Sequence, residues 1–343
     1  MTLPNYRQRF SQTLHRGGPP NKTSHSTPDA RKLRLGTVNV GTLRGRANEV
    51  AETLERREID VCCIQEAGWR GEGARHIDGR SKQFKLFWTG NSSGHGGVGI
   101  MVAEKWIEKV IAVNRVNDRL MSVKLLVGKT IMAIHSTYAP QQGLPKECKE
   151  EYYSVLNKYL RSQDENALTF IGGDMNGHVG QDKEGYTAAH GGHGYGTRNL
   201  EGHLILEFCT THDLLLLNTC FKRKVEHLIT YSSGGCQSQI DFIITSNRNR
   251  KLVKNTKVIP GEAAFTQHRL VVSDLSIPDN LKQVKKPLHK AKLRVWKLKD
   301  PEVKASYQRE VAKAIKANPL LSGVDTFSSC LKDPLILATE KTW

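Results

Sequence analysis

The stretch that decides the fold is ALTFIGGDMNGH, residues 167–178. Its first half is almost wholly apolar, which predicts a buried strand. We expect the strand to break at Gly172 and Gly173 into an acidic loop that carries Asp174 and Asn176. A charged side chain beside a core strand is costly to bury unpaired, so it either reaches water or binds something. This stretch therefore combines a core strand with a candidate site.

The chain before it contains a strand–helix–strand unit. Alternating apolar residues predict a strand over residues 33–40, and ANEVAETLERRE (47–58) spaces Val50 and Leu54 as an amphipathic helix does. IDVCCIQE (59–66) then predicts a buried strand that ends on Gln65 and Glu66. A unit of this kind points the end residues of its second strand into a crevice.

The remaining pattern predicts an α+β fold. Apolar runs at 84–90, 97–103, 120–127 and 130–140 follow one another without helices, which favours antiparallel pairing. Helices are expected at about 145–160 and 201–212, a long Gly- and His-rich loop at 183–199, and further strands at 214–218, 238–246 and 268–277. We therefore expect a four-layer α/β sandwich of two mostly antiparallel sheets flanked by helices.

The charge divides the chain into three parts. Its net charge is +17, of which residues 1–34 contribute +6 and residues 278–343 contribute +7. We expect a disordered basic arm at 1–32, one domain at 33–277, and a basic linker with one helix (about 301–317) within 278–343. Such basicity favours a polyanionic partner, either nucleic acid or an acidic membrane face, and here it adds affinity rather than chemistry.

Composition excludes several other classes. The 7 cysteines form no CxxC pair, so we expect neither a disulfide framework nor a zinc site, and we expect Cys62 and Cys63 to be core residues. Residues 1–16 lack the apolar core of a signal peptide, and no apolar run is long enough to span a membrane. We expect a soluble, intracellular and nuclear protein. The histidines at 178, 190 and 193 are expected to be exposed in their loop rather than to bind a metal.

Polar side chains gather at the ends of the predicted strands. Strands end on Asn39, on Glu66, on Asp174 with Asn176, and on Asp241, and another begins at His268. Any one of these would be an ordinary residue meeting solvent, but five such positions together favour a site. Asn39 and Glu66 offer the amide and carboxylate oxygens that Mg²⁺ prefers.

This set suits phosphodiester cleavage, which needs a positioned water, a proton acceptor and stabilisation of the charge on phosphate. Asp174, Asn176, Tyr138, His268 and the cation are suited to those roles. By itself the same inventory fits several classes of hydrolase.

The ordered segments resemble a known superfamily. TVNV, IQE, STYAP, GGDMN, QIDFI and TQHR occur in the order of the endonuclease/exonuclease/phosphatase superfamily, whose fold is DNase I-like. Within it the chain is most similar to the endonuclease domains of RTE/BovB-type non-LTR retrotransposons, on the strings VIPGEAAFTQHRLVVSDL, GTRNLEGHLILEFCTTHDLLLLNT and VWKLKDPEV. The resemblance implies that 278–343 is a remnant leading toward a reverse transcriptase that the chain does not contain.

The resemblance also implies roles for individual residues. Asn39 and Glu66 match the metal site for Mg²⁺ or Mn²⁺, and Tyr138 matches a tyrosine that contacts the scissile phosphate. Asp174 matches the residue that orients or deprotonates the attacking water, or protonates the leaving oxygen, with Asn176 as its partner. Asp241 matches the residue that orients the catalytic His268, which stabilises the phosphate or transfers protons.

Three positions depart from the pattern of the superfamily. Gln267 stands before His268 where an Asp is usual, Gly41 replaces an Asp of the apurinic endonucleases, and Gln141 replaces an Asn after the Tyr-x-Pro motif. The last two disfavour a dedicated abasic-site enzyme. Further candidate DNA contacts are Arg70, Arg198, Asn199 and Gln267.

The sequence thus predicts a divalent-metal-dependent endonuclease that nicks DNA, of the retrotransposon type. Two alternatives stay open. One is a catalytically dormant element that binds chromatin or protein, which Gln267 favours. The other is a phosphodiesterase on a non-nucleic-acid substrate such as a lipid.

Overall fold

The computed structural model describes residues 30–278 together with 301, 302, 304–306, 308, 309 and 312. The predicted arm up to residue 29, and most of the predicted linker and tail, lie outside the described residues. Those described beyond residue 300 are helical, in the range where the sequence predicts a helix. Among the described residues, no helix has both the length and the apolar character needed to cross a membrane.

The first sheet contains the predicted strand–helix–strand unit. Its strand order is β14-β15-β1-β2-β5-β4-β3. Strands β1 and β2 are parallel, joined by helix α1, and the other neighbours are antiparallel. The strands are β1 (Ala30–Asn39), β2 (Val61–Gln65), β3 (Glu72–Asp78), β4 (Gln83–Thr89), β5 (Val98–Ala103), β14 (Val253–Val258) and β15 (Val271–Pro278), and α1 is Ala47–Arg56.

The second sheet has the order β10-β13-β9-β8-β7-β6, and here β8 and β9 are the parallel pair. Its strands are β6 (Val110–Asn117), β7 (Leu120–Val127), β8 (Thr130–Tyr138), β9 (Leu168–Asp174), β10 (Leu214–Leu216) and β13 (Asp241–Ser246). The longer helices α3 (Lys146–Arg161) and α4 (Leu200–Thr211) lie where the sequence predicts helices, and α2 (Glu104–Ile107) is a single turn. A separate hairpin pairs β11 (Tyr231–Ser233) with β12 (Cys236–Ser238).

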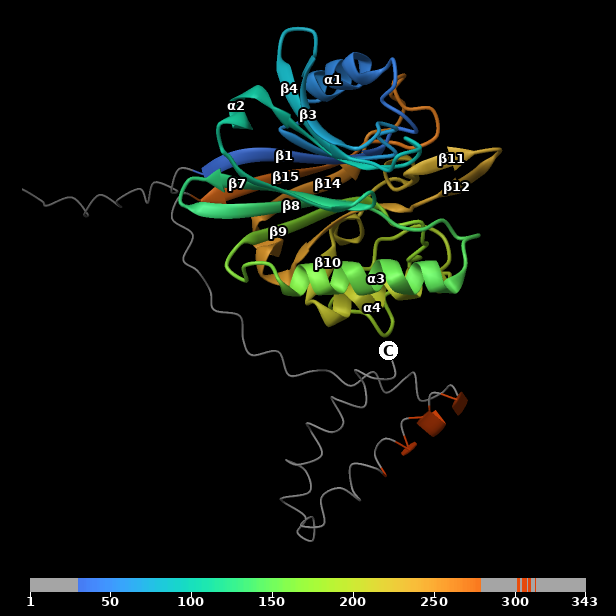
Figure 1. Cartoon of the computed structure of the whole chain (residues 1–343). Coiled ribbons are helices and arrows are strands. Elements are labelled where there is room, and N and C mark those ends of the chain that lie inside the picture. The colour runs from blue at the N-terminus through green and yellow to red at the C-terminus, as the bar shows by residue number, and fades with distance from the viewer. Residues whose placement is uncertain (1–29, 279–300, 303, 307, 310–311, 313–343) are drawn as a thin grey trace, which may run out of the picture.

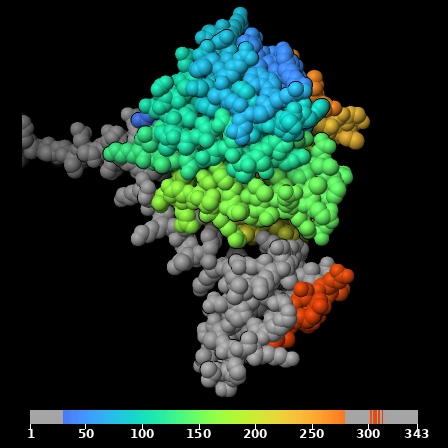
Figure 2. Space-filling view, viewed as in Figure 1, coloured from blue at the N-terminus to red at the C-terminus, as the bar shows by residue number. Residues whose placement is uncertain are grey.

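Four layers result, as the sequence predicts. Figure 1 shows α1 on the outer side of the first sheet and α3 with α4 on the outer side of the second, with the two sheets between them. In the space-filling view of Figure 2, the residues of the first sheet's β3–β5 region cover the upper part and those of the α3 region the lower part. The fold is an α+β sandwich of two mostly antiparallel sheets flanked by helices.

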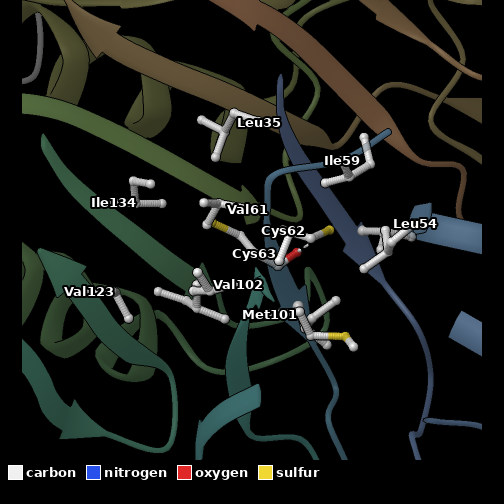
Figure 3. Close-up of a cluster of buried hydrophobic side chains, with 14 of the residues drawn as sticks. Leu35, Leu54, Ile59, Val61, Cys62, Cys63, Met101, Val102, Val123 and Ile134 are labelled. Atoms are coloured by element: carbon white, nitrogen blue, oxygen red, sulfur yellow. Dashed lines mark hydrogen bonds between the residues drawn. The ribbon is translucent and has the colours of Figure 1, made fainter. Parts of the chain in front are cut away.

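The main core lies between the two sheets. Figure 3 shows Leu35, Val61 and Cys63 of the first sheet beside Val123 and Ile134 of the second. Cys62 and Cys63 are fully buried, as the sequence predicts. The cysteines of the described residues are free thiols.

The predicted break at Gly172 and Gly173 is wrong. Strand β9 runs through both glycines to Asp174, because they pair with Ser136 and Thr137 of β8 on one side and with β13 on the other. A Cβ at Gly172 would lie 2.9 Å from the Cβ of Cys63 in the facing sheet. The glycine therefore serves close packing of the sheets rather than a turn.

Other elements also differ from the expectation. The sequence pattern predicts no strand between Glu66 and residue 84, but β3 lies there, paired with β4 along its whole length. Asp241 begins β13 rather than ending a strand, and because β13 is antiparallel to β9 it still lies opposite Asp174. Strand β1 starts at Ala30, ahead of the expected boundary, because it pairs there with the end of β15.

Candidate active site

The site forms where strands of the two sheets end side by side. In the second sheet, Tyr138 of β8, Asp174 of β9 and Asp241 of β13 are aligned in register on three neighbouring strands. In the first sheet, Asn39 ends β1 and Glu66 directly follows β2, whose last residue Gln65 pairs with Asn39. The predicted carboxylates, amide and phenol therefore converge at one edge of the sandwich.

Asn39 joins the two sheets at this edge. Its Nδ2 donates to Glu66 Oε1 at 2.9 Å and to Asp174 Oδ2 at 3.1 Å, and its Oδ1 accepts from the backbone N–H of Gly41 at 2.9 Å. The hydroxyl of Tyr138 also donates to Glu66 Oε1, at 2.7 Å. In this orientation the amide nitrogen of Asn39, and not its oxygen, faces the carboxylates.

His268 lies between two buried carboxylates. Its Nδ1 is 3.0 Å from Asp241 Oδ2, and its Nε2 is 3.8 Å from Asp174 Oδ2. Burial lowers the pKa of His268, but the charges of Asp241, Asp174 and Glu66 outweigh burial and raise it to about 9. The imidazole is therefore protonated at neutral pH. Burial, and then the charge of Asp241, raise the pKa of Asp174 well above its usual range.

Asn176 and Glu66 each have a strained backbone conformation. Both have positive φ, +47° for Asn176 and +54° for Glu66, which is uncommon outside glycine and concentrates at functional sites. The backbone N–H of Asn176 donates to Asp174 Oδ1 at 3.0 Å, and its side-chain Nδ2 donates to the carbonyl of Ala139 at 2.9 Å. The turn thus fixes the carboxylate of Asp174.

A pocket of about 590 Å³ opens beside this cluster. We call it the reaction pocket; its lining includes Glu66, Tyr138, Gln141, Arg119, His95 and Asp118. Sequence reasoning missed Arg119, which lies in the turn between β6 and β7. Its guanidinium is 5.2 Å from the Tyr138 ring centroid and donates to the Tyr138 carbonyl at 3.2 Å. No local motif marks Arg119, because only the pairing of β7 with β8 brings it to the site.

Two groups of side chains could hold a cation. Asp174, Asp241 and His268 can place ligand atoms within 4.8 Å of one another, but the protonated His268 already balances these carboxylates. The donor set fits better at Glu66. Within residues 30–278, both side-chain hydrogen bonds to its carboxylate go to Oε1, so Oε2 is available to a hard divalent cation. Asn39 would offer its oxygen there only with its amide turned over.

The predicted DNA contacts lie in different places. Arg70 is exposed and lines a second pocket. Arg198 instead holds its own loop, donating to the carbonyls of Val179 at 3.0 Å and Asp182. Asn199 caps α4, where its Oδ1 accepts from Gly202 N–H at 2.8 Å.

Gln267 is exposed and bonds to the β11–β12 hairpin, with its Nε2 3.1 Å from Ser233 Oγ. This side-chain hydrogen bond of Gln267 therefore goes to the hairpin. Of the three loop histidines, His190 is fully buried, contrary to expectation, because its Nε2 bonds with the Gly180 carbonyl at 3.0 Å.

Comparison with curated proteins finds longer relatives. Craniofacial development protein 2 of Bos taurus is 30% identical over 244 residues, covering 70% of this chain and 40% of the relative. The protein of the same name from Tragulus javanicus is 28% identical over 260 residues, covering 72% of this chain and 44% of the relative. The chain thus spans less than half the length of these relatives. No family model matches the chain.

Solved structures share the fold. The endonuclease domain of TRAS1, a telomere-specific non-LTR retrotransposon, has a TM-score of 0.51 at 16% identity, covering 73% of this chain and 100% of that domain. AP endonuclease LMAP of Leishmania major has a TM-score of 0.55 at 14% identity, and the match covers 72% of this chain and 89% of that enzyme. The 3′ phosphatase NExo of Neisseria, bound to a product DNA hairpin, has a TM-score of 0.52 at 15% identity, and the match covers 71% of this chain and 99% of that protein. The chain therefore has a DNase I-like fold, as its motifs imply.

Proposed function

We propose that this protein is a divalent-metal-dependent endonuclease that hydrolyses DNA phosphodiester bonds and leaves nicks. The observation that carries the proposal is the convergence of Glu66, Asp174 and His268 through Asn39 and Asp241, beside a pocket large enough for a phosphodiester. The carboxylate of Glu66 lies outside the contacts of His268 and is suited to a cation. Asp174 and the His268 imidazolium supply the proton acceptor and the positive charge that phosphodiester hydrolysis uses.

The side chains would divide the work as follows. Asp241 fixes the His268 ring through Nδ1, so Nε2–H is free to donate to a non-bridging phosphate oxygen as negative charge grows there. Asp174, fixed by the turn at Asn176, orients the attacking water and accepts its proton. Tyr138 and Arg119 line the same pocket and add contacts to the phosphate.

Glu66, together with Asn39, would hold Mg²⁺ or Mn²⁺. Such a cation supplies Lewis-acid neutralisation of the phosphate oxygens when bound. In the orientation that the structure has, the amide of Asn39 sets the separation of Glu66 and Asp174, because its Nδ2 donates to both. Coordination by Asn39 would replace these two hydrogen bonds with a bond from Oδ1 to the cation.

DNA is the substrate that the charge favours. The flanks at 1–34 and 278–343 carry +13 of the net +17 charge, and phosphate contacts by Lys and Arg supply sequence-independent affinity. The likeness to the TRAS1 endonuclease domain supports a retrotransposon-type role, which would place the protein in the nucleus.

The test is nicking of supercoiled plasmid by the full chain with Mg²⁺. We expect wild type to nick, and Asp174→Ala and His268→Ala each to lower the rate by about 100-fold or more, because each removes a group used in the transition state. Chelation of the metal should abolish nicking. His76→Ala is the matched control, since His76 is exposed on β3 and lies in neither pocket. If wild type and both active-site variants behave alike, the enzymatic proposal fails.

A further inference from the structure

A second pocket, of about 380 Å³, lies next to the reaction pocket. Its size is at the lower end of the range for small-ligand sites. It is lined by Arg44, Gly68, Trp69, Arg70, Arg75 and Trp88. We call it the tryptophan pocket. Its lining is basic and aromatic, with no carboxylate, and this combination suits a ligand that has both a flat ring and a negative charge.

The two indoles are held in place. Their ring centroids are 4.8 Å apart with an interplanar angle of 88°, an edge-to-face pair. Trp88 Nε1 donates to the Arg70 carbonyl at 3.3 Å, and the Trp88 ring occupies the space where a side chain at Gly73 would lie. Arg115 ties the carbonyls of Trp88 and Gly73 together at 3.0 and 2.8 Å. A fixed aromatic surface loses little conformational entropy when a ligand stacks on it.

The tryptophan pocket adjoins the site of the proposed chemistry. Arg44 and Gly68 line both it and the reaction pocket. The Arg44 guanidinium is fixed between them, donating to the Gly68 carbonyl at 2.6 Å and to the Gly94 carbonyl at 2.8 Å. A DNA strand with one phosphate in the reaction pocket would therefore bring a neighbouring nucleotide to the tryptophan pocket.

We propose that the tryptophan pocket binds one unstacked nucleotide of the strand that is nicked, adjacent to the scissile phosphate. The base stacks on the indoles, while Arg70 and Arg75, both exposed, contact its phosphate. A base inside a duplex cannot enter a concave pocket, so the nucleotide must leave the helical stack. The free-energy cost of unstacking and unpairing is smallest for a base that is unpaired or mismatched. The proposal rests on the proposed DNA-nicking function, and it adds a preference for duplexes with an unpaired base near the cut.

The test measures binding by the full chain in EDTA, where the proposed cleavage does not proceed. The probes are two duplexes of equal length, one with a single bulged 2-aminopurine and one fully paired. We expect the bulged duplex to bind about 5-fold more tightly or better, and the 2-aminopurine emission to be quenched on binding, because stacking on an aromatic side chain contributes at this scale.

Variants separate stacking from general charge. Trp69→Leu and Trp88→Leu should remove the preference and the quenching, and Arg70→Ala and Arg75→Ala should reduce the preference. Arg80→Ala is the matched control, an exposed arginine just after β3 that lines neither pocket, and it should weaken both probes equally. Circular dichroism checks the folding of the two tryptophan variants. If the tryptophan variants unfold, the comparison of Arg70→Ala and Arg75→Ala with Arg80→Ala decides the test.

Two results would overturn the inference. One is equal affinity of wild type for the two duplexes, and the other is a preference that the tryptophan-pocket variants retain as fully as Arg80→Ala does. The nicking assay with Mg²⁺ is independent of this outcome. A chain that nicks without preferring the bulge contradicts only the tryptophan-pocket proposal, whereas a chain that prefers the bulge without nicking contradicts only the proposed function.

Discussion

His268 shows how the site sets the charge of one residue. Its neutral form would be favoured by burial alone, yet the two aspartates that face its ring nitrogens keep it protonated. Because the folded pKa of about 9 lies above the ordinary value of 6.5, the ion pair stabilises the fold fully below about pH 6.5. That stabilisation is lost as the pH rises through about 9.

This predicts a measurable titration. In NMR spectra the ring of His268 should titrate with a pKa near 9, and Asp241→Asn should lower that pKa, since it removes the nearest negative charge. The difference in free energy of unfolding between wild type and Asp241→Asn should shrink as the pH is raised from 7 to about 10. A His268 pKa near 6.5 in wild type would contradict the proposed charge state.

At the scale of elements, the β11–β12 hairpin is bonded to Gln267, where the sequence departs from the motif pattern of the superfamily that it resembles. Figure 1 shows the hairpin extending from one side of the body. Gln267 fastens it twice, through its carbonyl to Ser232 N–H at 2.9 Å and through its side chain to Ser233 Oγ. The Tyr231 ring lies 4.8 Å from the ring of His268, so the hairpin also packs against the imidazole.

We therefore expect Gln267 to act as a positioning residue. Gln267→Ala should speed amide hydrogen exchange in the hairpin about 2- to 12-fold, the effect of losing one neutral hydrogen bond, and should slow nicking. Gln267→Glu is the control, because its carboxylate can still accept from the Ser233 hydroxyl, and it should retain the slower exchange. Unchanged exchange and nicking in Gln267→Ala would rule out this role.

The elements that the sequence predicted are those with a regular apolar pattern. Strands β4, β5, β7, β8 and β9 and helices α1, α3 and α4 bury one face or both, so their periodicity is visible. Strand β3 was missed because most of its side chains are exposed, and β11–β12 because its residues are polar. Their Gly-rich composition masked pairing that depends on neighbouring strands.

At the scale of the whole molecule, the site depends on how closely the two sheets approach. Gly172 lies under Cys63 and Thr37 of the facing sheet, and an added Cβ would be 2.9 to 3.0 Å from their atoms. Nearby, Asn39 of the first sheet bonds to Asp174, which ends the same strand as Gly172. The spacing of the sheets and the geometry of the site are therefore linked.

Gly172→Ala should consequently lower the free energy of unfolding by about 1–3 kcal/mol, the usual cost of overpacking a core. Chemical denaturation measures this. Gly143→Ala is the matched control, because an added Cβ there meets nothing within 4 Å, and it should change stability by less than about 1 kcal/mol. Equal stability of the two variants would show that the interface can relax.

The sequence also predicted the layered fold and the residues Asn39, Glu66, Tyr138, Asp174, Asp241 and His268 that the structure brings together. It could not place Arg119, Trp88 or the Gln267–Ser233 bond, because each depends on contacts between segments distant in the chain. Arg198 and Asn199 are predicted DNA contacts, and in the structure Arg198 bonds to Val179 of its own loop while Asn199 caps α4. Sequence patterns identified the strand ends, and tertiary pairing decided what surrounds them.

The pairing of Ala30 with Pro278 has a consequence for how this body can be carried within longer proteins. Both of its connections leave from one corner, at the opposite end of β1 from Asn39 and about 30 Å away from it. A unit of this kind can be inserted into a longer protein with its two junctions side by side and far from the reaction pocket. Segments fused before Ala30 or after Pro278, such as an affinity tag, would therefore leave the reaction pocket accessible. The body formed by residues 30–278 is thus suited to insertion into a longer chain.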